Sequence, residues 1–312
     1  MADVSVIYIA GMGRSGSTVV DQLLGARPGY FSGGELEKIW RYGVLENWLC
    51  ACGVPFGSCG FWSQVRSSDP GLLTTEAALA TVHYQHFTLD RLMYPLWSEG
   101  GRRRIIKSTP SAYFDRIARL YRAVALASGC SVIVDSSKHP GYAHLLLHSG
   151  AVSRVRMVHL VRDPRAVAYS WINPKVDLSS PGGKPYVFGA VSPARSAATW
   201  LEWNVTTERV AQAIPGPYSL LRYEDFAADP EGSFHRLGLI DATVSDGPAQ
   251  NTELQGQRHM VFGNPARMRT GPIVVKLDNR WRERMRKRDD LTVSVIAAPL
   301  LRRYGYRFRP SQ

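Results

Sequence analysis

The chain has 312 residues, of which 45% are hydrophobic and 21% charged, as in an ordinary globular protein large enough for one α/β domain or two smaller ones. With 38 Lys and Arg against 26 Asp and Glu, its net charge of +12 suits a polyanionic ligand. No stretch approaches the roughly 20 apolar residues of a membrane span, and the N-terminal sequence lacks a signal peptide's basic start and cleavage site. We therefore expect no membrane span and a cytoplasmic location.

The first predicted strand, residues 4–10, leads into a glycine-rich loop at residues 11–18 and then a helix-like segment at residues 19–24. A strand, a loop of small residues and a helix in this order form a ready anion site. Backbone N–H groups and the positive end of the helix dipole converge at the loop.

Two motifs fit this loop. Gly11, Gly13 and Gly16 match a dinucleotide fingerprint, whereas Gly11, Gly16 and Thr18 match a phosphate loop in which Ser17 replaces the lysine. That lysine reaches the β- and γ-phosphates in nucleotide triphosphatases, so its absence argues against a γ-phosphate. The loop then predicts a cradle for a smaller anionic group, with Arg14 as the nearest cation.

The remaining pattern alternates strands with helices. Residues 36–101 are rich in Trp, Gly and Cys, and we expect an irregular lid or insertion there, whereas residues 173–191 predict a mobile loop rich in Pro and Gly. Further strands are predicted at residues 131–135, 154–161 and 218–223, and helices at residues 111–128, 164–171 and 193–213. The alternation predicts one α/β domain over residues 1–312, a parallel sheet flanked by helices. Ligands bind at the carboxyl ends of such strands, an edge that should carry Arg14, Lys138 and Arg162.

Two later loops also carry cations. Arg162 precedes a helix that begins at Pro164, and Ser170 follows about two helical turns on, so the two side chains could hold a second phosphate. The alternative is a surface pair of Arg162 with Asp163 that leaves Ser170 unengaged. Residues 263–272 are too rich in Gly and Pro for a helix, and there Arg267 and Arg269 would close over an anion.

Five motifs in order resemble the sulfotransferases that use 3′-phosphoadenosine-5′-phosphosulfate (PAPS). They are residues 11–18, 134–138, 159–164 with Ser170, 222–225, and Gly263-Asn264-Pro265 with Arg267 and Arg269, and the resemblance spans about residues 4–306. It implies a P-loop-like sheet and a nucleotide-closing loop at about residues 259–273. Cytosolic small-molecule members carry a lysine where Arg14 stands, so this chain looks closer to the tyrosylprotein, carbohydrate and bacterial branches.

The resemblance assigns roles to individual residues. The 5′-phosphosulfate would be held by Gly13, Arg14, Ser15, Gly16, Ser17 and Thr18. Arg162 and Ser170 would hold the 3′-phosphate, and Tyr223 would lie near the nucleotide. Asn264, Arg267 and Arg269 would belong to the closing loop. PAPS is then the co-substrate, and the acceptor is a hydroxyl, or as second choice an amine, of an unidentified small molecule, carbohydrate or natural product.

Glu35 is the candidate base, because it follows Gly33-Gly34 and resembles the catalytic glutamate of tyrosylprotein sulfotransferases. A positioned carboxylate can take the proton that an attacking hydroxyl loses. The alternative is an exposed acid that begins a helix at residues 36–42, with Glu37, Glu46 and more distantly His139 as other candidates. Lys138 and Arg14 would stabilise the leaving side, unless Lys138 is an ordinary capping lysine. Positioning and charge stabilisation suffice for such a transfer, so no metal is expected.

Three rival functions use some of the same features. A dinucleotide-dependent oxidoreductase would need Glu35 to end a second strand, and residues 27–34 are a poor strand by composition. A P-loop nucleotide kinase lacks its lysine. A nucleic-acid-binding protein could use the basic residues 280–288, but no binding signature accompanies them, so we expect no nucleic-acid partner and a solvated helix face there.

Three of the four cysteines are close together in the sequence: Cys50, Cys52 and Cys59, with Cys130 alone. A metal site lacks an obvious fourth ligand, because His83 and His86 are distant in the sequence. We expect an incidental or local structural role, with zinc or a redox pair as the alternatives.

Overall fold

The structure is a computed structural model that describes residues 4–89, 91, 93–150, 154–213, 216–240, 258–269 and 271–308. Thr270, in the predicted closing loop, lies outside the described residues.

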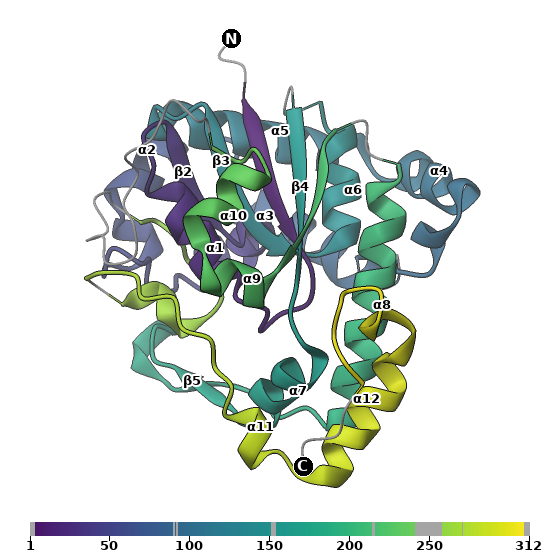
Figure 1. Cartoon of the computed structure of the whole chain (residues 1–312). Coiled ribbons are helices and arrows are strands. Elements are labelled where there is room, and N and C mark those ends of the chain that lie inside the picture. Colours follow the sequence, from purple (N-terminus) through teal and green to yellow (C-terminus); the bar gives the residue numbers. More distant parts are fainter. Residues whose placement is uncertain are drawn as a thin grey trace.

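Within these residues the main sheet has five parallel strands, with β1 at its centre (Figure 1). The strands are β1 (Ser5–Ala10), β2 (Tyr30–Gly34), β3 (Val132–Lys138), β4 (Arg154–Val161) and β7 (Tyr218–Arg222). Their order is β2-β3-β1-β4-β7, so β1 pairs with β3 and β4 and not with β2. The dinucleotide-binding fold has its second strand beside its first. The strand order therefore contradicts the oxidoreductase alternative.

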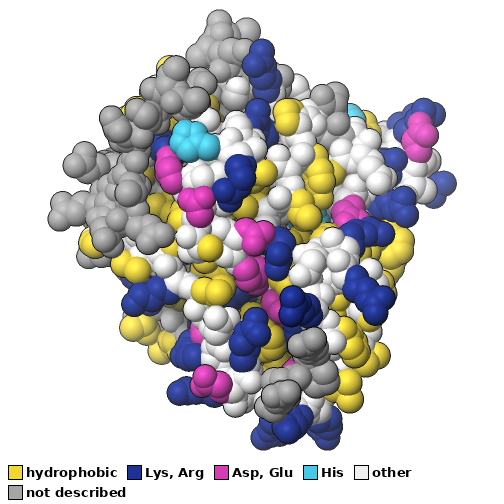
Figure 2. Space-filling model, in the orientation of Figure 1, with side chains coloured by type: hydrophobic (Ala, Val, Ile, Leu, Met, Phe, Trp, Pro, Cys, Tyr) yellow, Lys and Arg dark blue, Asp and Glu magenta, His cyan; other side chains and the backbone are white. Residues whose placement is uncertain are grey.

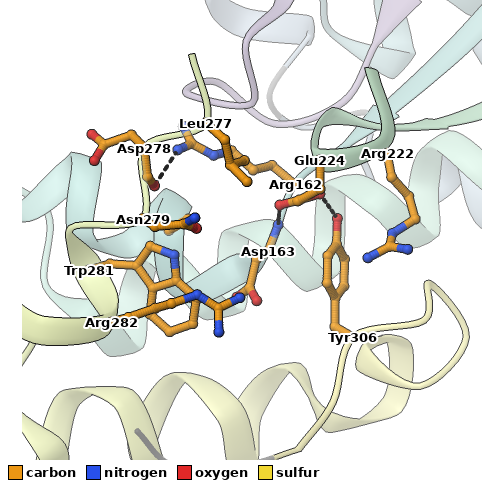
Figure 3. A pocket seen from close by; sticks show the side chains of 11 residues that line it. Arg162, Asp163, Arg222, Glu224, Leu277, Asp278, Asn279, Trp281, Arg282 and Tyr306 are labelled. Atoms are coloured by element: carbon orange, nitrogen blue, oxygen red, sulfur yellow. Dashed lines mark hydrogen bonds between the residues drawn. The ribbon is translucent and has the colours of Figure 1, made fainter. Parts of the chain in front are cut away.

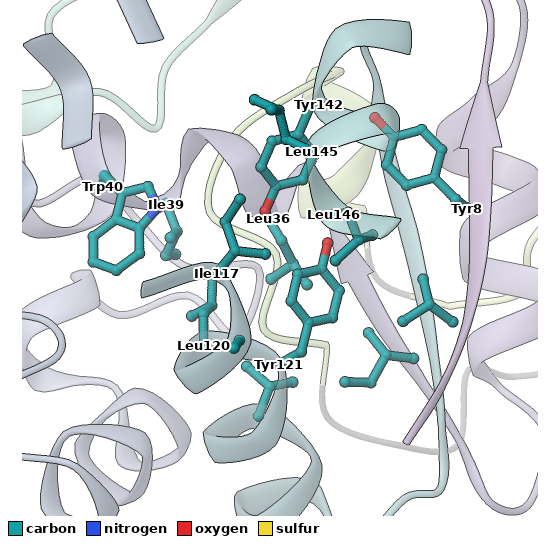
Figure 4. Packing of buried hydrophobic residues seen from close by; sticks show 14 of the residues in the cluster. Tyr8, Leu36, Ile39, Trp40, Ile117, Leu120, Tyr121, Tyr142, Leu145 and Leu146 are labelled. Carbon is teal, nitrogen blue, oxygen red and sulfur yellow. The ribbon is translucent and has the colours of Figure 1, made fainter. Parts of the chain in front are cut away.

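Helices cover both faces of the sheet, as predicted. They are α1 (Ser17–Gly25), α2 (Gly60–Ser68), α3 (Thr75–Thr88), α4 (Glu99–Ser108), α5 (Ser111–Ser128), α6 (Pro140–His148), α7 (Pro164–Ile172), α8 (Pro193–Ala211), α9 (Tyr223–Ala228), α10 (Pro230–Arg236), α11 (Trp281–Arg284) and α12 (Lys287–Leu301). Side chains alternate along β1: Val6 and Tyr8 join the core with α5 and α6, whereas Ile7 and Ile9 join the core with α1, α9 and α10. Figure 4 shows the α5–α6 side, where Tyr8, Tyr121 and Leu145 pack together.

The described part of residues 36–101 is largely helical, so the expected irregularity is wrong, whereas the expected lid or insertion stays a prediction. After the 3-10 helix η1 (Leu36–Lys38) and the π-helical η2 (Ile39–Leu45), the segment forms α2, α3, α4 and the short 3-10 turns η3 (Phe56–Ser58) and η5 (Pro95–Trp97). Trp40, Trp48 and Trp62 are fully buried and belong to the same core cluster as the sheet. The elements are short and interrupted, which hid their periodicity, but their aromatic side chains supply much of this core.

Residues 30–34 form the edge strand β2, which corrects the expectation of a poor strand. Close packing against α1 explains the small residues of β2, because a Cβ on Gly25 of α1 would lie 2.4 Å from the Ser32 Cβ. Asp21 of α1 accepts hydrogen bonds from the Ser32 hydroxyl and from the Gly34 amide, the latter at 3.1 Å. Contacts to a helix, rather than β propensity, therefore fix this strand, and it ends directly before Glu35.

Residues 173–191, expected as a mobile loop, contain the antiparallel hairpin β5 (Lys175–Asp177) and β6 (Tyr186–Phe188), joined through η6 (Pro181–Gly183). In Figure 1 the strands of the main sheet end toward α7 and β5. The loop at residues 263–272 likewise contains a 3-10 turn, η7 (Pro265–Met268).

The basic run at residues 280–288 lies in α11 and the start of α12, and Arg282 and Arg284 in it are exposed. Figure 2 shows one face of the molecule, and in its lower half Lys and Arg gather with Asp and Glu between them. Arg280 pairs with Asp278 at 2.7 Å, as on a solvated surface. Among the described helices, none combines the length and apolar character needed to cross a bilayer.

Candidate active site

The glycine-rich loop takes backbone conformations that demand glycine. Gly11 has φ +131, and a Cβ there would lie 2.3 Å from the Leu160 carbonyl oxygen; Gly16 has φ +96, and a Cβ there would lie 2.2 Å from the Tyr223 ring. Arg14 also has a positive φ, 73, which is uncommon for a residue with a side chain. The loop is thus tightly shaped between β1 and the start of α1.

The loop also leaves a buried donor without a partner. Ser15 is 1% exposed, and its hydroxyl has no hydrogen-bond partner among the described residues. Gly16 caps α1 without any side-chain hydrogen bond, Ser17 is buried in the first helical turn and Thr18 beside it is half-buried. Buried polar groups are normally paired, so this geometry fits an anion bound at the N-terminus of α1.

Aromatic rings hold the Arg14 side chain. Its guanidinium lies 4.7 Å from the Trp171 ring centroid and 5.1 Å from that of Phe188. Gly13 allows this, because a Cβ there would lie 3.3 Å from Trp171. Burial lowers the pKa of Arg14, and the nearby Glu35 carboxylate opposes that shift. Such a stacked guanidinium is oriented before any ligand arrives.

Glu35 and Lys138 meet at the carboxyl ends of β2 and β3. The Lys138 ammonium lies 2.6 Å from the Glu35 Oε1, and the side chains are 13% and 12% exposed. Lys138 has φ +69 and also donates to the Ser136 carbonyl at 3.0 Å. The Gly263 backbone passes beside the carboxylate, since a Cβ there would lie 2.6 Å from Oε1. The pair is therefore enclosed, yet still reachable.

The other candidate acids lie in different settings. Glu37 is buried and pairs with Lys38, and Glu46 accepts hydrogen bonds from Arg41 and Trp48. His139 accepts from the Gly141 amide and caps α6. Among the described contacts of these groups, Lys138 pairs with Glu35, which keeps Glu35 the best placed acid.

Arg162 follows β4 and reaches the glycine-rich loop. It donates to the Arg14 carbonyl at 3.2 Å and to the Asp278 carbonyl at 3.3 Å, and it lies 4.9 Å from the Tyr223 ring centroid. Its buried Nε has no partner among the described residues. Asp163 pairs with Arg165 at 2.8 Å instead, so the predicted alternative of an Arg162–Asp163 pair is wrong.

Figure 3 shows that Arg162 lies at the wall of a pocket between β4, α11 and the C-terminal segment. Arg222 and Arg282 also line it. Glu224 also lines the pocket, and its carboxylate already accepts hydrogen bonds from the Asp163 amide at 3.0 Å and from the Tyr306 hydroxyl at 2.8 Å. Ser170 is half-buried on α7, and Tyr223 donates to the Lys276 carbonyl at 3.1 Å.

A further cation at this site was missed by the sequence reasoning. Lys175 of β5 is exposed, yet desolvation by its neighbours lowers its pKa first, followed by the positive charges of Arg14, Arg162 and Arg269. These three arginines come from separate loops, so the site gathers at least four cations. Lys175 lies in the Pro- and Gly-rich stretch that we expected to be mobile, and no motif marked it.

The three predicted residues of the closing loop lie in different settings. Asn264 accepts a hydrogen bond from the Ala266 amide and so caps η7, whereas Arg269 is exposed. Arg267 is 1% exposed, pairs with Asp177 at 2.6 Å and also donates to the Ser179 hydroxyl. In this conformation Arg267 joins the loop to the β5–β6 hairpin, and the geometry does not favour a direct contact to a ligand.

Comparisons with known proteins bear on the family and the fold of the chain. A family model described as the sulfotransferase family matches residues 6–238. The sulfotransferase domain of the Synechococcus PCC 7002 olefin synthase superposes with a TM-score of 0.51 and 19% identity, covering 98% of this chain and 96% of that one. Sulfotransferase STF9 from Mycobacterium avium gives a TM-score of 0.47 and 14% identity over 98% of this chain and 78% of that one. No curated protein matches the chain.

Proposed function

The chain belongs to the sulfotransferase family, and from that premise we propose that it transfers a sulfuryl group from PAPS to a hydroxyl, or as second choice an amine, of a small acceptor. The acceptor is a small molecule, carbohydrate or natural product. A cytoplasmic location stays a prediction of the sequence.

One observation carries the donor assignment: buried donors without partners lie at two separate anion positions. The Ser15 hydroxyl is at the N-terminus of α1, and the Arg162 Nε is at the end of β4. A nucleotide with a 5′-phosphosulfate and a 3′-phosphate would satisfy both, with Arg14 at the first position. Lys175 and Arg269 add positive charge nearby, which favours a doubly phosphorylated ligand.

The transfer requires only positioning and charge stabilisation from the chain. The acceptor oxygen attacks sulfur in line, and the bond from sulfur to the 5′-phosphate oxygen breaks, so that the electron pair stays on that oxygen. Glu35 takes the acceptor proton. Lys138, Arg14 and the loop amides stabilise the charge that develops on the leaving phosphate. The Glu35–Lys138 contact keeps the base and the leaving-side cation within one site before the substrates bind.

A ligand-binding experiment tests the donor assignment. We expect 3′-phosphoadenosine-5′-phosphate to raise the Tm of the protein with the logarithm of its concentration over Kd once that ratio exceeds one, because a ligand specific for the folded state stabilises it. NAD and ATP serve as the matched controls and should raise the Tm far less. An equal rise with NAD or ATP would contradict the proposal.

A transfer assay tests the activity itself. The protein is incubated with PAPS and panels of phenols, glycosides and natural-product alcohols, and sulfated products are identified by mass spectrometry. We expect a product whose mass increases by one sulfuryl group and whose formation needs both PAPS and Glu35. If the nucleotide binds but no compound in any panel is sulfated, the proposed acceptor class is wrong and the donor assignment is unaffected.

A further inference from the structure

Three cysteines and one histidine gather outside the candidate active site. Cys50, Cys52, Cys59 and His259 each offer one ligand atom, and these atoms all lie within 4.8 Å of one another. Cys59 Sγ lies 3.7 Å from Cys50 Sγ and 3.6 Å from Cys52 Sγ. His259 Nδ1 lies 3.2 Å from Cys59 Sγ and 3.6 Å from Cys50 Sγ. This histidine is the fourth ligand that the sequence analysis did not find.

These distances match the edges of a coordination tetrahedron. Zinc bonds of about 2.3 Å to sulfur and about 2.0–2.1 Å to nitrogen place neighbouring sulfurs about 3.8 Å apart, and sulfur and nitrogen about 3.5 Å apart. A disulfide would need two sulfurs at about 2.05 Å, and Cys59 is instead nearly equidistant from two sulfurs. All four cysteines are free thiols in the structure. Four of the six distances within the set are thus close to tetrahedral edges, and the other two are at most 4.8 Å.

The backbone holds the ligands in place. Cys50 and Cys52 lie in a tight turn in which the Gly53 amide donates to the Cys50 carbonyl at 2.8 Å, and Gly53 has φ +93. Trp62 donates to the His259 carbonyl at 2.9 Å, and the Phe61 ring stacks on the His259 ring at 4.6 Å. Cys50, Cys59 and His259 are buried, whereas Cys52 is exposed. Three ligands are thus fixed in the core and the fourth leaves an approach for a metal ion.

We propose that these four residues form a structural zinc site of the Cys₃His type. Three thiolates and an imidazole form a donor set that suits zinc, and four protein ligands leave no open position for substrate. The site is distinct from the transfer chemistry, which needs no metal. It joins two segments far apart in the sequence: the turn at residues 50–59 and the segment that the structure describes again from residue 258.

The zinc site also has a consequence for the candidate active site. The Ala51 amide donates to the Met260 carbonyl at 2.8 Å, so the chain that follows His259 runs beside the turn that holds Cys50 and Cys52. Met260 then packs on Gly34, where a Cβ would lie 2.8 Å from its Cγ, and Gly263 follows beside Glu35. Zinc at this site therefore anchors the closing loop against Gly34, which directly precedes the candidate base Glu35.

Metal analysis of the wild-type protein tests the proposal. We expect one zinc per chain by elemental mass spectrometry after purification without chelators. We also expect that Co²⁺ exchange gives the visible bands of tetrahedral cobalt and the near-ultraviolet band of thiolate ligation. A chelator should lower the Tm, because binding energy of a structural metal is folding energy.

Variants assign the ligands. Cys52→Ser changes only an exposed ligand and should fold, yet it should lose at least tenfold in zinc affinity and shift the cobalt spectrum, whereas the control Cys130→Ser should keep both. His259→Ala should lose zinc altogether. Less than 0.1 zinc per wild-type chain, a disulfide among these cysteines by mass spectrometry, or unchanged zinc affinity in Cys52→Ser would each overturn the proposal.

Discussion

Two ion pairs of the same length occupy different settings. Glu35 and Lys138 lie 2.6 Å apart at the strand ends, with 12–13% of each side chain exposed. Asp177 and Arg267 also lie 2.6 Å apart, between the hairpin and the closing loop, with 1% exposed. The first pair can be reached by a substrate, whereas the second is sealed. A charged residue in a family motif can therefore contact the ligand or stabilise the loops around it, and the exposure of its side chain separates these two roles.

The sealed pair gives the largest expected effect. Arg267→Ala leaves the Asp177 carboxylate buried without its partner, which typically costs about 3–5 kcal/mol of stability. We expect that loss in the free energy of unfolding measured with urea. The double variant Arg267→Met/Asp177→Leu removes both charges and should recover most of it. A stable Arg267→Ala protein that binds the nucleotide poorly would reverse the roles of the two pairs.

The reachable pair should affect turnover instead. Glu35→Gln keeps the side chain's size but cannot accept the acceptor proton, so we expect kcat to fall by at least ~10²-fold. Affinity for 3′-phosphoadenosine-5′-phosphate should change little. Glu46 accepts from Arg41 and Trp48 instead, so Glu46→Gln is the matched control and should keep its rate. Full turnover in Glu35→Gln would remove Glu35 from the role of base.

Arg162 adds a third setting to the comparison, because within the described residues its side chain donates to backbone carbonyls and forms no ion pair. Arg162→Ala should weaken nucleotide binding by about 10- to 100-fold, which corresponds to the roughly 1.5–3 kcal/mol of a charged hydrogen bond. Calorimetric titration measures this loss. The exposed Arg284 controls for total charge, and Arg284→Ala should bind within about twofold of the wild type. Equal losses in both variants would mean that net charge, rather than position, attracts the nucleotide.

The smallest effect concerns the ring that orients Arg14. Trp171→Leu removes a cation–π contact worth about 0.5–2 kcal/mol, so nucleotide affinity should fall by about 2- to 30-fold. Trp171→Phe retains a ring face and should lose less. An equal loss in the two variants would point to packing rather than to the cation–π contact.

Much of the fold could be predicted because periodic segments carry their own signal. The helix at residues 111–128 and the strand at residues 154–161 match α5 and β4 residue for residue. The edge strand β2 and the helices of residues 36–101 could not be found in this way, because contacts from α1 and from buried tryptophans fix them. Tertiary context overrides local propensity in such segments.

The candidate site divides similarly. Residues at strand ends, such as Arg14, Lys138 and Arg162, could be placed together by topology alone. Lys175 and His259 could not, because their partners are remote in the sequence and meet them only in the folded chain. The buried pairing of Arg267 also depends on the hairpin, which the sequence did not reveal.

The most direct measurement is a calorimetric cycle over Arg162 and the 3′-phosphate. Adenosine 5′-phosphate and 3′-phosphoadenosine-5′-phosphate are titrated into the wild type and into Arg162→Ala, which isolates the coupling between the two groups. We predict that the wild type prefers the doubly phosphorylated nucleotide by about 10- to 100-fold and that the variant loses most of this preference. An undiminished preference in the variant, or none in the wild type, would contradict the assignment of two anion positions at the strand ends.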